Sequence, residues 1–306
     1  MPFSVRPFRR DDRDQLTDLV NTHAAAVVPG AAVSVNTVLT SLERRPGEFV
    51  TDPWVGERAT LVAEARGQVV AAAHLLHYRR DADVDASLRG AGVVEWFVHR
   101  VPGELWPDAE RAADALMAAC LARFARRRVL TRYADGQLPV PGLCGVPEQW
   151  PHVRALYERS GFLHSGGTEV LLLARVDDLP EPQGAPLPGL VLERRLGGLG
   201  TRLTARLDGR ALGYVEIGTG LARPERHAGG GLADLTDWEV GPAGRDGGVL
   251  RWLLGHARRW LELGGSARLL AYGEEGGADT ALLARSGFTE VSRLRRGWEH
   301  RAGASG

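Results

Sequence analysis

The sequence predicts an α/β protein made of two tandem domains, each with a mixed β-sheet flanked by helices. Three observations lead to this prediction. Short landmarks occur twice in the same order, a proline-rich segment separates the two sets, and strand-like and helix-like stretches alternate in both halves. The 306 residues are enough for two domains of ordinary size.

The internal repeat rests on three pairs of short segments. These pairs are residues 67–71 with 209–213, 95–98 with 237–240, and 159–162 with 285–288. The last pair is an identical Arg-Ser-Gly-Phe tetrapeptide. One such match would be weak evidence, but three in the same order indicate two copies of one fold.

A stiff polar segment lies between the two copies. Residues 177–188 contain four prolines and two aspartates, a composition unsuited to the interior of a helix or strand. The predicted organisation is therefore an N-terminal domain over 1–176, a linker over 177–188 and a C-terminal domain over 189–306.

In the N-terminal half, hydrophobic periodicity predicts strands and helices in turn. Two helices are expected after the first strand, one around 16–23 and one over 35–44. A later helix opens at Pro107 with acidic residues in its first turn, where the helix dipole favours them. The other expected elements are strands at 4–8, 59–65, 69–77, 92–98 and 168–176, and a helix at 151–159.

The C-terminal half repeats this order without the first two helices. A strand at 190–196 is followed almost at once by a hairpin over 203–217, centred on Asp208-Gly209. A strand over 232–240 then leads to an amphipathic helix whose apolar positions run from Val249 to Leu261.

Composition narrows the classes of function. Basic and acidic residues number 38 each, so the chain has no net charge and does not resemble a nucleic-acid binder. Every basic residue is arginine, which excludes lysine Schiff-base chemistry. The two cysteines lie apart without a metal-binding motif, and no metal site is expected. Since the sequence shows neither a signal peptide nor a membrane-length apolar run, we expect a cytoplasmic protein without a membrane partner.

The order of elements resembles the GNAT superfamily of acyl-CoA-dependent N-acetyltransferases, and the resemblance covers nearly the whole chain, taken twice. In that family, a Gln/Arg-x-x-Gly-x-Gly/Ala signature at the start of the central helix binds the CoA pyrophosphate through backbone N–H groups. Glycines let the backbone approach closely, and a helix N-terminus presents free donors to an anion. The resemblance implies acetyl-CoA as co-substrate and an amine as acceptor.

In the C-terminal half, the positions that match this signature are 245–250, directly before the amphipathic helix. Arg245 and Gly247 agree with the signature, whereas Leu250 stands where the family has a small residue and could crowd the pyrophosphate. The cofactor-binding positions that the resemblance implies are Val240, Arg245, Gly247, Gly248, Val249 and Leu250.

In the N-terminal half, the corresponding positions are 108–113. They lack both glycines and place Asp108 and Glu110 where a pyrophosphate would lie. The N-terminal cofactor site is therefore expected to be lost.

The resemblance also points to two catalytic residues. Family members often use a carboxylate on the strand before the glycine loop as a base that acts through water, and Glu239 has that position. They often use a tyrosine five residues before the Gly-Phe phenylalanine. Tyr157 matches in the N-terminal half, where a packing role is the alternative, and Leu283 replaces it in the C-terminal half. Tyr272, Tyr214 or solvent would then protonate the leaving thiolate.

Two functional hypotheses follow. The first is an N-acyltransferase, with acetyl as the default acyl group, that acts on a small-molecule or peptide amine bound where the two domains face each other. The second is a non-catalytic binding or scaffold protein in which both cofactor sites have decayed. The sequence leaves the acceptor and the oligomeric state open.

Overall fold

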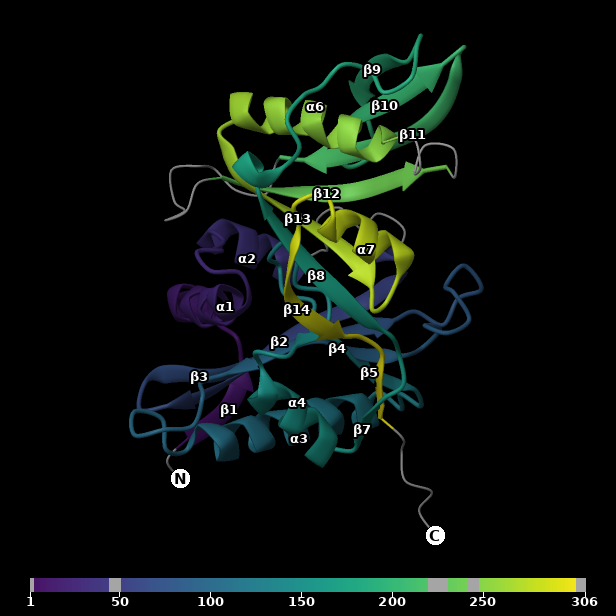
Figure 1. The fold of residues 1–306 in the computed structure, drawn as a ribbon. Coiled ribbons are helices and arrows are strands. Elements are labelled where there is room, and N and C mark those ends of the chain that lie inside the picture. Colours follow the sequence, from purple (N-terminus) through teal and green to yellow (C-terminus); the bar gives the residue numbers. More distant parts are fainter. Residues whose placement is uncertain (1–2, 44–50, 220–230, 242–247, 301–306) are drawn as a thin grey trace. The chain divides into compact units, whose positions relative to one another are not determined.

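The computed structural model describes residues 3–43, 51–219, 231–241 and 248–300. The chain forms two compact units. The first comprises residues 1–168 together with 293–306, and the second comprises residues 169–292. Each unit contains a mixed β-sheet with helices, as the sequence predicted (Figure 1).

The first unit is built on a seven-stranded sheet. Its strands β1 to β4 are antiparallel neighbours, and β5 joins β4 in parallel. The strand order is β1 (Phe3–Pro7), β2 (Val55–Ala65), β3 (Gln68–Tyr78), β4 (Gly92–His99), β5 (Arg132–Ala134), β15 (Trp298–His300) and β7 (Phe162–His164).

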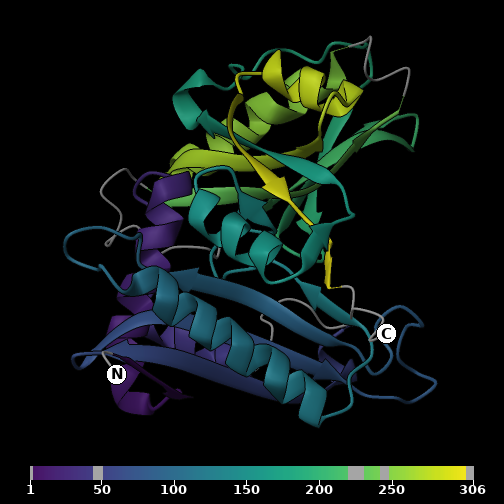
Figure 2. The same cartoon turned by 90° about the horizontal axis from the view of Figure 1, so that it is seen from below.

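Among the described residues of this unit, four α-helices accompany the sheet. They are α1 (Arg13–Val27), α2 (Val35–Glu43), α3 (Ala109–Arg126) and α4 (Pro151–Arg159), with short 3-10 turns at Arg10–Asp12 and Asp52–Trp54. Figure 2 shows α3 lying across the strands of this unit, and its buried residues, such as Leu116, Cys120 and Phe124, follow a helical period. The predicted pair of helices after the first strand is present as α1 and α2.

The second unit has its own sheet. Strands β12 and β13 pair in parallel, whereas β9 with β10, β10 with β11, β11 with β12, and β8 with β13 pair antiparallel. The order is β14 (Thr289–Arg295), β8 (Thr168–Arg175), β13 (Ser266–Glu274), β12 (Gly231–Val240), β11 (Arg210–Gly218), β10 (Thr201–Leu207) and β9 (Val191–Leu196). A short strand, β6 (Val146–Pro147), pairs with Leu294 and Arg295, the end of β14 that belongs to the first unit.

In the described part of the second unit, the helices are α6 (Val249–Leu263), α7 (Ala278–Ala284) and a 3-10 turn at Val176–Asp178. The apolar residues of α6 pack on one face of the sheet, where Leu253 and Leu254 share a buried core with Val215 and Leu235 (Figure 1). No helix lies between β9 and β10, which confirms that the second copy lacks the first two helices.

Each sheet contains the last strand of the other half of the sequence. In the first unit, β15 from the C-terminal end of the chain lies between β5 and β7. In the second unit, β8 pairs with β13 from Arg268 to Glu274 and lies between β13 and β14. Hydrogen bonding thus assigns β8 and β15 to sheets that local sequence does not identify, and the domain boundaries at 176 and 189 stay a prediction.

None of the helices in the described parts of the chain combines the length and apolar character that crossing a membrane requires.

Candidate functional site

In the second unit, β12 and β13 separate part-way along their length. The two strands pair at residues 231–234 of β12, and the last pair is Asp234 with Leu270. A bulge in β12 follows directly. Ile217 of β11 faces Leu235 and the preceding residue, Glu216, faces Asp237, so Thr236 is the extra residue on β12. The bulge sharpens the local twist, so that residues 235–240 continue along β11 and not along β13.

Helix α6 begins just beyond the end of β12. Gly248 precedes it with φ +72°, in the left-handed region that favours glycine, and a Cβ placed there would meet no atom of the described residues within 4 Å beyond its chain neighbours. The amides of Val249 and Leu250 belong to the first turn and have no acceptor within the helix. That first turn contains no acidic residue. The start of α6 therefore presents N–H groups and the positive end of a helix dipole beside open space.

The side chain of Leu250 does not lie in that open space. It is 2% exposed and belongs to the same core as Val249 and Leu253. The large residue at the signature's last position therefore packs inward and does not crowd an anion at the helix start.

The first unit has a comparable pair of strands but a different helix start. Strand β4 pairs with β5 at Gly92 to Val94, and the amide of Gln137 then donates to the carbonyl of Glu95 at 3.0 Å, so the chain after β5 stays against β4. Asp108 precedes α3, and Glu110 lies in its first turn. A cavity of about 150 Å³ at this end is lined partly by Trp106 and Asp108. Two carboxylates at a helix N-terminus disfavour an anionic ligand.

A larger cavity, of about 690 Å³, also lies in the first unit. It is bounded by α2, by the end of β1 and by the middle of β2, where Thr60 lies next to His74 with an Oγ1 to Nδ1 distance of 2.9 Å. This volume is within the range that small-molecule ligands occupy.

Comparison with proteins of known structure identifies this fold. No family model matches the sequence, and no curated protein matches it either. Among solved structures, a tandem GNAT protein from the clavulanic acid biosynthesis pathway is 18% identical, covers 99% of this chain and 100% of its own, and has a TM-score of 0.67. The chain has the tandem GNAT fold.

Two further structures support this assignment of the fold. A GCN5-related N-acetyltransferase from Sphaerobacter thermophilus is 14% identical over 97% of this chain and 95% of its own, with a TM-score of 0.58. A glucosamine N-acetyltransferase region of a fungal multi-domain β-N-acetylglucosaminidase is 14% identical over 97% of this chain, with a TM-score of 0.62. This chain spans only 38% of the length of that fungal protein.

Within this GNAT fold, the predicted cofactor positions are described only in part. Gly248, Val249 and Leu250 lie at the start of α6, and Val240 is a buried residue at the end of β12. Arg245 and Gly247 lie outside the described residues, so their role stays a prediction.

The two predicted catalytic residues lie in different units. Glu239 is an exposed residue next to the end of β12, and it faces Tyr214 on β11. Tyr157, in the first unit, is fully buried and donates its hydroxyl proton to the carbonyl oxygen of Asp135 at 2.7 Å. Burial raises the pKa of Tyr157 well above its usual range. Its local hydrogen bond agrees with the packing interpretation, and the catalytic roles of both residues stay predictions.

Sequence reasoning missed an acidic residue at the point where the strands separate. The carboxyl group of Asp234 accepts a hydrogen bond from the Tyr272 hydroxyl at Oδ2, at 3.0 Å. Its Oδ1 is buried without a hydrogen-bond partner in the described part of the chain. Burial raises the pKa of Asp234 to about 7, against the lowering effect of the bond from Tyr272, and Glu169 raises it further. The sequence signal was a charged residue between the apolar residues Ala233 and Leu235, at the fourth position of β12.

Proposed function

We propose that the protein is an acyl-CoA-dependent N-acyltransferase, with acetyl as the default acyl group and with the acyl-CoA bound in the second unit. The observation that carries the proposal is the separation of β12 from β13 after Asp234, together with the start of α6, where Gly248 has no side chain to block an anion. The solved GNAT structures named above support the fold, and the activity is our inference from the geometry.

The residues present fit the cofactor. A pyrophosphate would accept hydrogen bonds from the first amides of α6, where Gly248 lets it approach, while Val249 and Leu250 face the core. When bound, the cofactor supplies a thioester carbonyl that an amine can attack. From Val240 back to Asp234 the strand spans about 20 Å, so Asp234 would line the inner end of a site that begins at α6, and Glu239 its outer end.

In this proposal, Asp234 accepts the proton that the attacking amine loses. A carboxyl group whose pKa is near 7 is matched to proton transfer at neutral pH. The Tyr272 hydroxyl, which donates to Oδ2 of Asp234, would be the proton donor for a thiolate and would recover its proton from Asp234. Both side chains would then return to their starting protonation states.

Calorimetric titration of the full chain with acetyl-CoA and with CoA tests this proposal. We expect saturable binding that Gly248→Leu weakens by roughly tenfold or more, because the side chain fills the space at the helix start. Gly276→Leu is the matched control, since Gly276 has φ +70° and equally open surroundings in the same unit. If neither acetyl-CoA nor CoA bound to the unmodified chain, the transferase proposal would fail and the non-catalytic binding or scaffold protein would be the remaining hypothesis.

The acid–base assignment is tested separately. Asp234→Asn should retain acetyl-CoA binding while the release of free thiol in the presence of an amine falls by about 100-fold or more. Glu239→Gln should reduce that rate much less. An unchanged rate in Asp234→Asn would remove Asp234 from the proposed reaction.

A further inference from the structure

The second sheet ends in a strand with one open edge. Strand β9 pairs with β10 from Val191 to Leu196, and it is the last strand in the order of this sheet (Figure 1). No backbone hydrogen bond from the described residues reaches its other edge. Alternate residues of an edge strand point their N–H and C=O groups outward, where a further strand can pair with them.

Apolar side chains are exposed along this edge. Leu196 is 90% exposed, the largest value for a large hydrophobic residue in the described part of the chain, and Val191 and Leu199 are 58% and 55% exposed. Charged residues commonly protect such an edge from pairing. The charges of β9 have both signs, however, and therefore repel only a partner strand whose charges come in the wrong order.

These charges lie on both faces of β9. Arg194 is on the face that α6 covers, and its guanidinium lies over the Trp260 ring, 4.9 Å from the ring centre. Alternation along the strand places Glu193 and Arg195 on the opposite face. There Glu193 forms an ion pair with Arg206 at 2.5 Å and a second one with Arg195.

Two copies of β9 can pair along this edge in only a few registers. Opposite residues of an antiparallel pair both point their backbone groups toward the partner or both point them away, so in two identical strands their numbers have an even sum. A pair centred on Glu193 or on Arg195 sets like charges opposite each other and joins no opposite charges. A pair centred on Arg194 sets Glu193 of each copy opposite Arg195 of the other. The same register sets Leu192 opposite Leu196.

We propose that β9 is the interface of a homodimer, in which two β9 strands pair antiparallel about a two-fold axis at Arg194. Glu193 and Arg195 then form two symmetric cross-strand ion pairs, and each Leu196 gains an apolar neighbour. Arg194 lies opposite Arg194 of the other copy, and each guanidinium stays stacked on the Trp260 ring of its own copy. This dimer does not depend on the function proposed above.

Sedimentation velocity of the full chain tests whether it associates with itself. Because a single strand pair buries little surface, we expect a dimer with a Kd on the order of 1–100 μM. The sedimentation coefficient should therefore rise from that of a monomer to that of a dimer between about 1 and 500 μM chain. A chain that stays monomeric over this range would overturn the proposal.

Two charge reversals test the register. Glu193→Arg and Arg195→Glu should each weaken self-association by about tenfold or more, since each puts like charges at both symmetric contacts. An equimolar mixture of the two variants should recover the dimer, because every such contact then joins an arginine to a glutamate. A mixture that stays monomeric would overturn this register.

Two further variants separate the interface from general effects of charge and folding. Leu196→Ser, at a position that is 90% exposed, should weaken the dimer without lowering the unfolding temperature measured by circular dichroism. Arg285→Glu, the same charge reversal at the exposed end of α7, should leave self-association unchanged. An effect of Arg285→Glu as large as that of Arg195→Glu would show non-specific association and would also overturn the proposal.

Discussion

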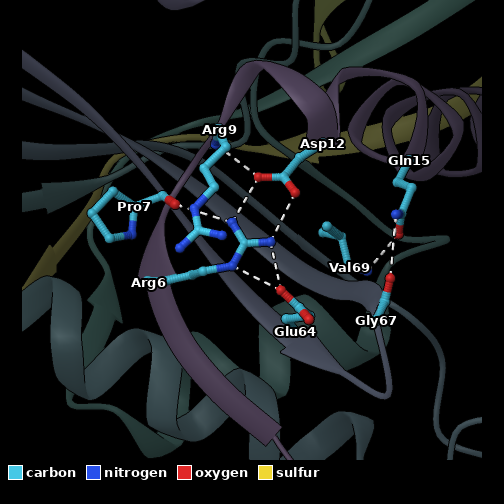
Figure 3. Close-up of polar contacts among 8 residues, drawn as sticks. All are labelled: Arg6, Pro7, Arg9, Asp12, Gln15, Glu64, Gly67 and Val69. Atoms are coloured by element: carbon cyan, nitrogen blue, oxygen red, sulfur yellow. Dashed lines mark hydrogen bonds and ion pairs between the residues drawn. The ribbon is translucent and has the colours of Figure 1, made fainter.

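At the scale of single residues, Asp12 shows how one carboxylate connects three segments of the first unit. It accepts two hydrogen bonds from the Arg6 guanidinium, at 2.7 and 2.8 Å, and one from the amide of Arg9 at 2.7 Å (Figure 3). Arg6 also donates to Glu64 of β2 at 2.8 Å. The group thereby fixes β1 against β2 and closes the 3-10 turn Arg10–Asp12 that precedes α1. These bonds hold the pKa of Asp12 below its usual range.

We expect Asp12→Asn to lower the free energy of unfolding of the first unit by about 2 kcal/mol, since it removes a charged acceptor from three bonds. Urea titration measures this change, and Asp11→Asn, at an exposed neighbour, is the control. Because the folded pKa of Asp12 is depressed, its contribution is present above pH 3.8 and is lost as the pH falls through the folded pKa. Equal effects of the two variants would contradict this account.

Three histidines in the first unit lead us to expect a second loss of folding stability at acid pH. The Nε2 atoms of His23 and His152 lie 3.1 Å apart, and the ring of His99 lies 4.6 Å from that of His152. Burial lowers the pKa of His23 to about 4 and of His152 to about 3, and it lowers that of His99 too.

The unfolded chain therefore binds more protons than the folded unit once the pH falls below about 6.5. Stability should fall between pH 6.5 and 4, and each histidine can contribute up to about 1.4 kcal/mol per pH unit. His152→Gln should make this pH dependence shallower in thermal unfolding measured across that range. His164→Gln on β7 should leave it unchanged, and a parallel curve for both variants would argue against the histidine group.

At the scale of elements, β15 completes the first sheet although it comes from the end of the chain. Trp298 on β15 is 1% exposed and packs 5.7 Å from Tyr157, measured between ring centres, and 5.2 Å from His164. Trp298→Ala should lower the free energy of unfolding by about 3–5 kcal/mol, because it leaves a cavity among these rings. Leu163→Ala, at a half-exposed position on the adjoining strand, should cost far less. Similar costs would mean that β15 adds little to this sheet.

At the scale of the whole molecule, the placement of β8 decides which fragments can fold. A fragment beginning at Leu187 lacks β8 and leaves β13 without its partner along seven residues. We expect that fragment to unfold or aggregate through the exposed strand edge. A fragment over 165–292 retains β8 and should show cooperative unfolding by circular dichroism. If the shorter fragment folded equally well, β8 would not be required by the second sheet.

The sequence by itself determined the tandem fold, since hydrophobic periodicity and repeated landmarks reflect local geometry that neighbouring residues impose. The same reasoning predicted the start of α6, because Gly248 and the apolar stripe after it are adjacent in sequence. The family resemblance points to Glu239 by its position on the strand before the glycine loop, and local pattern does not show where β12 leaves β13.

Only the tertiary structure decided three features. It brought Tyr272 onto Asp234 across 38 positions of sequence, it buried the Leu250 side chain in the core, and it exchanged β8 and β15 between the sheets. Each of these depends on which strands pair at long range. Pairing is set by the burial of whole sheet faces, and the residues of one strand do not encode the identity of its partner.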